Sequence, residues 1–172
     1  GEEYKIRKKL IENDLVEAIV ILPRNMFYTT DISVTLWILN KNKNQYKLVR
    51  NDISKKYRDR SGEILFMDLR RWGSEFEKKY VELTKDHIQK IIDNYHNWQQ
   101  TDYETTYKDV PEYCYSACFE EVKANDFSLV PSKYIEFMDR DSNIDFDTEM
   151  ERIQQEFKTL LAEEKDSQNQ LK

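Results

Sequence analysis

The sequence predicts an α/β fold in which short buried strands are accompanied by amphipathic helices. Two apolar runs, at 15–22 and 33–40, are rich in Val, Ile, Leu and Trp, a pattern typical of strands buried on both faces. About ten residues link them, too few for a crossover helix, so we expect the two strands to pair antiparallel. A third apolar run at 63–68 predicts another strand, and residues 84–98 predict a helix with one apolar face.

The remaining elements of the first hundred residues follow from local patterns. A helix is expected over 3–13, with Ile6, Leu10 and Ile11 as its apolar stripe; it starts so early that we expect the chain to begin inside a fold. We expect residues 46–60 to form a mixed polar insertion, and the stretch up to Tyr80 to be charged. Thr84 is in position to cap the helix at 84–98, whose apolar residues are Ile88, Ile91, Ile92, Tyr95 and Trp98.

Residues 101–140 are expected to be a connecting segment. Short pieces of structure are predicted within it: a strand at 113–119, a helical turn at 120–125 and an extended stretch at 129–138, interrupted at Pro131.

The last helix, expected over 145–168, is different in kind. Thr148 and Glu151 have capping-box spacing, and the sequence beyond Ala162 has no apolar face and is expected to fray. A heptad-like stripe with 3,4,3 spacing, widened by one further leucine, consists of Met150, Ile153, Phe157, Leu160 and Leu161. A helix with one narrow apolar stripe is only marginally stable in isolation. It either folds back on its own domain or docks on another subunit, and its terminal position and acidic surroundings favour docking.

Charge argues against a protein that grips DNA alone. The net charge is −6, and residues 136–172 contain 11 acidic and 5 basic residues, so the rest of the chain is balanced. A protein that held phosphates by itself would show a basic surplus, so another component would supply most of the electrostatic attraction to nucleic acid. Without a membrane-length apolar run or an export signal, and with two cysteines, a cytoplasmic location is expected.

Common catalytic motifs are absent from the sequence. There is no GxGxxG, P-loop, nucleophile elbow or HExxH. Cys114 and Cys118 form a CxxxC pair without further ligands, so we expect buried thiols and no metal site. His87 and His96 are nine residues apart, which is not metal-ligand spacing, and are expected at the surface.

The link between the first two strands is unusual, because it sets Phe27 and Tyr28 beside Thr29, Thr30 and Asp31 at the end of a sheet. The segment IRKKLIENDLVEAIVILPRNMFYTTDISVTLWILNK, followed in order by EILFMDLRRWG, LTKDHIQKIIDNY and SACFEEVKANDFSLVPSKYIEF, resembles the latter part of the modification (M) subunit of type I restriction–modification enzymes. These enzymes are adenine-N6 DNA methyltransferases that use S-adenosylmethionine. The resemblance extends from about Lys5 to Met138.

The resemblance implies the C-terminal portion of a methyltransferase-type sheet, with antiparallel strands and flanking helices, followed by a helical tail. It implies DNA, a specificity subunit and a restriction subunit as partners, and S-adenosylmethionine as the cofactor of the full subunit. The tail, through Met150, Ile153, Phe157, Leu160 and Leu161, is expected to pack on the helical spacers of the specificity subunit.

The resemblance also implies what this segment lacks. The family places its methyl-donor motif and its Asn/Asp-Pro-Pro-aromatic motif upstream, and Pro23, Pro111 and Pro131 are all isolated. No catalytic, cofactor-binding or metal-binding residue is therefore assigned, and this chain alone is expected to be inactive and not to bind the cofactor.

The one family role that carries over is a wall of the target-base pocket. The aromatic after the first strand is the usual stacking partner of the flipped adenine, which implies Phe27, with Tyr28 as a substitute. The alternative is that Phe27 fills the end of the local core. A function of another class also stays open, a stand-alone, non-catalytic interaction module that binds a helical partner through its last helix.

Overall fold

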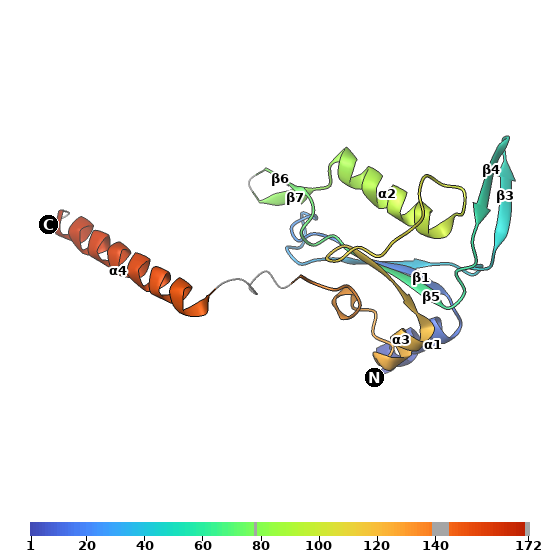
Figure 1. Ribbon diagram of the computed structural model, residues 1–172, viewed down its shortest axis with the longest axis horizontal. Helices are drawn as coiled ribbons and strands as arrows, with labels where there is room; N and C mark the ends of the chain where they lie inside the picture. Colours follow the sequence, from blue (N-terminus) through green and yellow to red (C-terminus); the bar gives the residue numbers. More distant parts are fainter. Residues whose placement is uncertain (78, 139–144, 171–172) are drawn as a thin grey trace. The chain divides into compact units, whose positions relative to one another are not determined.

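A mixed four-stranded sheet forms the centre of residues 1–137 of the computed structural model (Figure 1). The structure describes residues 1–77, 79–138 and 145–170, in two units, Gly1–Phe137 and Met138–Lys172. The strand order is β2-β1-β5-β8, with β1 at Val16–Ile21, β2 at Thr35–Leu39, β5 at Glu63–Asp68 and β8 at Cys114–Cys118. The predicted antiparallel pairing of β1 with β2 is confirmed, β5 runs parallel to β1, and β8 runs antiparallel to β5. The α/β class is confirmed.

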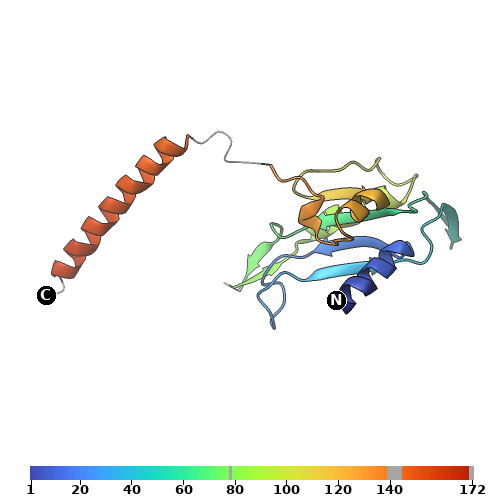
Figure 2. The same ribbon diagram turned by 90° about the horizontal axis from the view of Figure 1, so that it is seen from below.

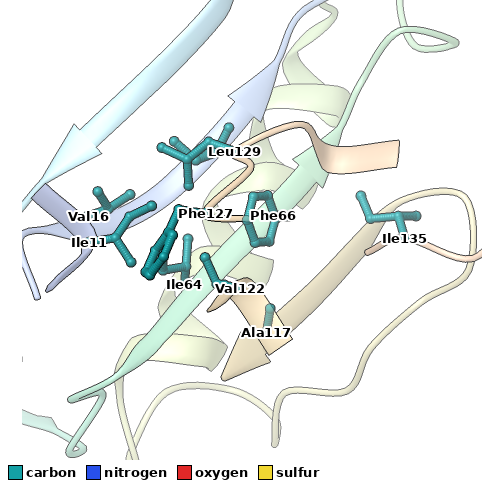
Figure 3. Close-up of a cluster of buried hydrophobic side chains, with 10 residues drawn as sticks. Ile11, Val16, Ile64, Phe66, Ala117, Val122, Phe127, Leu129 and Ile135 are labelled. Carbon is teal, nitrogen blue, oxygen red and sulfur yellow. The ribbon is translucent and has the colours of Figure 1, made fainter. Parts of the chain in front are cut away.

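Helices cover both faces of this sheet. Helices α1 (Glu2–Glu12) and α3 (Phe119–Ala124) lie together on one face, and α2 (Lys85–Gln99) covers the other (Figures 1 and 2). The two faces are built by strict alternation along β5: Ile64 and Phe66 enter the first core, shown in Figure 3, whereas Leu65 and Met67 enter the second beside Trp98. Burial on both faces explains why β1 and β5 read as continuous apolar runs.

The prediction that both of the first strands are buried on both faces is right for β1 and wrong for β2. Leu36, Trp37 and Leu39 are 45%, 43% and 53% exposed, because β2 is paired on one side only in the described part of the chain. An edge strand with exposed apolar side chains is a template for further pairing.

Two hairpins occupy segments in which we predicted no strand. The polar insertion at 46–60 forms β3 (Tyr46–Arg50) and β4 (Ile53–Tyr57), and the charged stretch before Tyr80 leads into β6 (Ser74–Phe76) and β7 (Tyr80–Glu82). Both sheets are two-stranded, so most of their side chains stay exposed. Their sequences mix apolar and charged residues, so none of them forms the continuous apolar run that signals a buried strand.

Most of the expected connecting segment, residues 101–137, belongs to the first unit. The strand and helical turn predicted there are β8 and α3, so β8 completes the central sheet. The expected extended stretch at 129–138 instead contains a 3₁₀ turn, η1 (Pro131–Lys133), and packs Leu129 and Ile135 into the first core. Pro131 stands at its first position, where its fixed φ favours a turn.

Local details of the predicted helices differ in part. In α1, Ile11 is buried and Tyr4 and Leu10 pack partly buried against the first core, whereas Ile6 is 60% exposed. In α2 the predicted cap is confirmed, since the hydroxyl of Thr84 accepts from the backbone N–H of His87 at 3.2 Å. Of its apolar residues, Ile91, Tyr95 and Trp98 pack against the core, whereas Ile88 and Ile92 are 45% and 38% exposed.

The second unit contains helix α4 (Phe146–Gln170), close to the predicted span. The predicted capping box is wrong, because the helix begins two residues earlier than Thr148. Asp145 precedes it, and the Thr148 hydroxyl donates to the Asp145 carboxylate at 2.6 Å. The helix continues past Ala162 to Gln170, where we expected fraying.

A buried polar network holds the amino ends of β1 and β5. The side chains of Glu17 and Arg60 are 2% and 1% exposed, and Arg60 Nε donates to Glu17 Oε1 at 3.0 Å. Gln99 Nε2 donates to the same oxygen at 2.9 Å. A buried charge is tolerated only when it is paired in this way. Removing one partner therefore leaves the other charge unpaired in a medium of low dielectric constant.

The Arg60→Met variant of this chain is therefore expected to lose about 3–5 kcal/mol in its free energy of unfolding, because Glu17 is left buried without a counter-charge. Urea unfolding followed by circular dichroism measures the loss. The double variant Glu17→Met/Arg60→Met should recover part of it, and Arg50→Met on an exposed strand should change stability by less than about 0.5 kcal/mol. An Arg60→Met variant as stable as the parent would contradict this account.

The cysteines give a second prediction, because the expectation of two buried thiols is wrong for one of them. Cys114 is 1% exposed, and burial raises the pKa of its thiol, whereas Cys118 lies at the exposed end of β8. Native protein should react with one iodoacetamide per chain, at Cys118, and the Cys118→Ser variant should not react. In urea the unfolded parent should react with a second iodoacetamide, at Cys114. Mass spectrometry counts the adducts, and rapid labelling of Cys114 in native protein would disprove the burial.

Candidate functional site

The carboxyl ends of the parallel strands β1 and β5 meet at one edge of the sheet, where α/β proteins place their ligands. The backbone N–H of Leu69, just after β5, donates to the carbonyl of Ile21 at 2.9 Å. The loop 22–34 leaves β1 at this edge, and its closing bond joins the Leu22 N–H to the Val34 carbonyl at 2.8 Å. The predicted aromatic loop therefore lies at the edge of the sheet where ligands most often bind in α/β proteins.

Within this loop the two predicted site residues are brought together and face outward. Phe27 is 40% exposed and Tyr28 is 73% exposed. A tight turn follows them, in which the Thr30 N–H donates to the Phe27 carbonyl at 3.3 Å. Across the base of the turn, Arg24 Nε donates to the Asp31 carbonyl at 3.1 Å, so the loop is braced internally.

A second aromatic ring, which the sequence analysis missed, completes this surface. Tyr80 of β7 meets Tyr28 edge-on, with ring centroids 4.6 Å apart. The contact is held in place because the Val81 N–H donates to the Asn25 carbonyl at 3.0 Å. Gly73 permits it, since a Cβ there would lie 2.4 Å from a Val81 methyl carbon. No local pattern signals this pairing, which joins residues more than fifty positions apart.

These residues line a hollow of about 280 Å³, formed by Asn25, Phe27, Tyr28, Thr29, Thr30, Asp31, Lys79 and Tyr80. Its chemistry combines aromatic rings with hydroxyls, an amide and one acid. Lys79 places its ammonium group 5.8 Å from the centroid of the Tyr80 ring. Such a surface suits a flat, polar-edged ring that stacks on an aromatic face.

A neighbouring hollow at the same edge is strongly charged. It has about 200 Å³ and is lined by Asp68, Arg70, Arg71, Glu112 and Phe137. Asp68 ends β5, is 4% exposed and accepts from Arg70 Nη2 at 2.6 Å, a bond that raises the pKa of Arg70. Arg71 Nη1 donates to Glu112 at 2.8 Å. These charges are compensated within the hollow.

Both hollows at this edge are smaller than the usual site for a ligand of the size of S-adenosylmethionine. Such sites have volumes of about 300–1,000 Å³. Two of the three glycines of the sequence, Gly62 and Gly73, stand singly at a turn before β5 and at the entry to β6, so they do not form a phosphate- or nucleotide-cradling loop.

The histidines lie in packed positions rather than at the open surface that we expected. His87 caps α2 and contacts the ring of Trp72, with centroids 5.5 Å apart. His96 is half-buried, and burial lowers the pKa of its imidazole. Among the described residues, no group of three or more His, Cys, Asp or Glu side chains is placed to hold a metal ion. Of the helices that the structure describes, none is both long and apolar enough to cross a membrane.

On α4 the predicted stripe is an exposed apolar surface. Met150, Ile153, Phe157, Leu160 and Leu161 are between 39% and 61% exposed. Beside the stripe, Arg152 bonds Glu149 and Glu156 at 2.7 and 3.0 Å. The helix is thus amphipathic, and its apolar side is open in the second unit considered by itself.

Comparison with known proteins identifies relatives for this arrangement. The family model for N-6 DNA methylase matches residues 1–143. The methylase subunit of the type I restriction enzyme HindI, from Haemophilus influenzae, is 34% identical over all of this chain and 35% of its own length. The MjaIX methylase subunit from Methanocaldococcus jannaschii is 29% identical over 99% of this chain and 28% of its own length.

A solved structure supports the same family relationship. The methyltransferase subunit of a type I restriction-modification system from Streptococcus thermophilus is similar, with a TM-score of 0.60 and 26% identity over 80% of this chain and 24% of that one. The chain spans about a third of the length of the curated relatives that it matches. With the family model matching most of its residues, the chain belongs to the N-6 DNA methylase family.

Proposed function

We propose that this chain is part of the M subunit of a type I restriction–modification enzyme, which transfers a methyl group from S-adenosylmethionine to adenine N6 in DNA. The observation that carries the proposal is the aromatic loop at the shared carboxyl ends of β1 and β5, in a chain of the N-6 DNA methylase family. The similarity to type I methylase subunits supports the same assignment.

In this proposal the loop forms one wall of the pocket for the flipped adenine. Enzymes that modify a base must rotate it out of the duplex and hold it against aromatic or apolar side chains. Phe27 is the proposed stacking residue, and Tyr28, backed edge-on by Tyr80, flanks it. The 40% exposure of Phe27 favours this role over that of a core plug, because a plug would be covered by its own domain.

The other proposed contributions are structural. The exposed apolar side chains of Leu36, Trp37 and Leu39 on β2 favour continuation of the sheet beyond this strand in the complete subunit. The donor and the transfer chemistry are assigned to other parts of that subunit, so this chain alone is expected to be inactive and to bind no S-adenosylmethionine. Helix α4 is proposed to dock on the specificity subunit, and DNA and the restriction subunit are the further partners.

Phe27→Ala in the complete enzyme is expected to lower the methylation rate on the order of 10- to 100-fold, because base–aromatic stacking is worth about 1–3 kcal/mol. Transfer of tritiated methyl groups to an oligonucleotide measures it. Ile92→Ala on α2 is the matched control, since Ile92 is 38% exposed and lines neither hollow at this edge, and it should retain the parent rate. Unchanged kinetics for Phe27→Ala would remove Phe27 from the pocket.

Ile153→Asp combined with Phe157→Asp is expected to abolish co-purification with the specificity subunit, because two charges would enter the apolar stripe of α4. The matched control is Gln155→Asp with Thr159→Asp, which adds the same charge at the same spacing on the opposite side of the helix. The control should still co-purify. Retention of the specificity subunit by the Ile153/Phe157 variant would overturn the docking proposal.

A second candidate function is a stand-alone, non-catalytic interaction module, which the exposed stripe of α4 favours. It predicts capture of a helical partner through the same five residues but no methylation that depends on Phe27. The two experiments above therefore separate the candidates: partner loss in the Ile153/Phe157 variant, together with no methylation by the parent protein, supports the module.

A further inference from the structure

The basic charge of the first unit is concentrated around one hairpin. Residues 41–60 contain eight Lys or Arg and two Asp, in a chain whose net charge is −6. This segment includes β3 and β4 and the stretches on either side of them. The expectation of a mixed polar insertion therefore understated it: the segment is a strongly cationic ribbon.

Three of these eight bases build the root of the hairpin. Lys43, 1% exposed, bonds Asp14 and donates to the Glu63 carbonyl at 2.6 Å. Arg60 is paired with Glu17, and Arg58 Nη2 donates to Glu63 Oε2 at 2.7 Å. Because Lys43 precedes β3 and Arg60 follows β4, buried cations fasten both ends of the hairpin to the sheet.

The root is stiffened further by rings and backbone bonds. Tyr46 and Tyr57, opposite each other across the strands, stack with ring centroids 4.5 Å apart and planes 10° from parallel. The Lys56 carbonyl accepts from the Thr101 N–H at 2.9 Å, and the Lys56 N–H donates to Asp102 at 3.0 Å. The hairpin is held as a fixed projection, and Figure 1 shows it standing out beyond the sheet.

The other five bases make no ion pair within the described part of the chain: Lys41, Lys47, Arg50, Lys55 and Lys56. Lys47 lies directly opposite Lys56 in the register, and like charges in that position are destabilising. On the other face, Arg50 and Lys55 lie on opposite strands beside the apolar Leu48 and Ile53, which are 44% and 62% exposed. Asp52, in the turn, is the one acid between the two strands.

We infer that the β3–β4 ribbon is a binding element for the phosphate backbone of double-stranded DNA, away from the target adenine. A two-stranded ribbon fits the major groove, which is about 12 Å wide and walled by phosphates on both sides. Cations on both faces of the ribbon, two on each within the strands, match that geometry. The inference rests on the proposed function, in which DNA is the substrate.

The position of the ribbon places this contact outside the base pocket. Leu39 of β2 pairs with Val16, at the amino end of β1, so the hairpin leaves the sheet at the end opposite the Phe27 loop. Six residues of strand separate the two ends by roughly 20 Å at about 3.3 Å per residue. With about 3.4 Å per base pair, the ribbon meets the duplex roughly six or more base pairs from the target base.

The test uses the complete methyltransferase, assembled with its specificity subunit, and a duplex lacking the recognition sequence. In the variant K47Q/R50Q/K55Q/K56Q, the slope of log K against log salt, measured by fluorescence anisotropy between about 50 and 200 mM salt, should become shallower by about 3 to 4. The Kd at about 100 mM salt should rise roughly 10-fold or more. Methylation at saturating specific DNA should keep the parent kcat, because the ribbon is far from the pocket.

The matched control K9Q/K90Q/K123Q/K133Q removes the same charge from exposed positions on α1, α2, α3 and η1. Its salt slope should stay that of the parent. An unchanged slope in the ribbon variant, or an equal change in both variants, would overturn the inference. So would loss of a partner subunit with DNA affinity intact, which would assign the ribbon to an acidic protein surface.

Different results would reject the inference about the ribbon and the proposed function. Absence of methylation by the parent enzyme would reject the proposed function. A parent that methylates DNA, with a ribbon variant of unaltered salt dependence, would reject only the ribbon as a DNA contact.

Discussion

The parallel pairing of β1 with β5 is the interaction on which the rest of this structure depends. Helices cover the paired strands on both faces and so form two cores, one under α1 and α3 and one under α2. The pairing also brings two carboxyl ends to the same edge, where neighbouring backbone N–H groups and loops converge. The aromatic loop after Ile21 and the charged turn after Asp68 become neighbours for that reason.

The opposite end of the same strand pair is built on different physics. There, buried cations act beside the apolar core, with Arg60 on Glu17 and Lys43 on Asp14. Buried ion pairs contribute little net stability, but they define one arrangement sharply, since any displacement leaves a charge unsolvated. A hairpin of only two strands is marginal alone, and these anchors explain how β3 and β4 keep a fixed direction.

The two ends of the sheet therefore have separate proposed tasks. The aromatic end offers stacking surfaces for a base, whereas the cationic end offers charges for a backbone. This division also resolves the charge argument: an overall charge of −6 does not preclude DNA contact when the acids are concentrated in residues 136–172 and the bases in residues 41–60. Local charge density, rather than the net value, determines what a surface attracts.

The sequence by itself determined β1, β5, α2 with its Thr84 cap, and the apolar stripe of α4, because periodicity and capping are properties of neighbouring residues. It also located Phe27 and Tyr28 at the end of a strand. Only the tertiary structure decided that β2 is an exposed edge, that Cys118 is open while Cys114 is buried, and that Tyr80 stands against Tyr28. The two hairpins were missed for the same physical reason. Their strands are stabilised by cross-strand pairs and by anchors such as Arg60 with Glu17, which join residues far apart in the chain and leave no periodic signal in either partner.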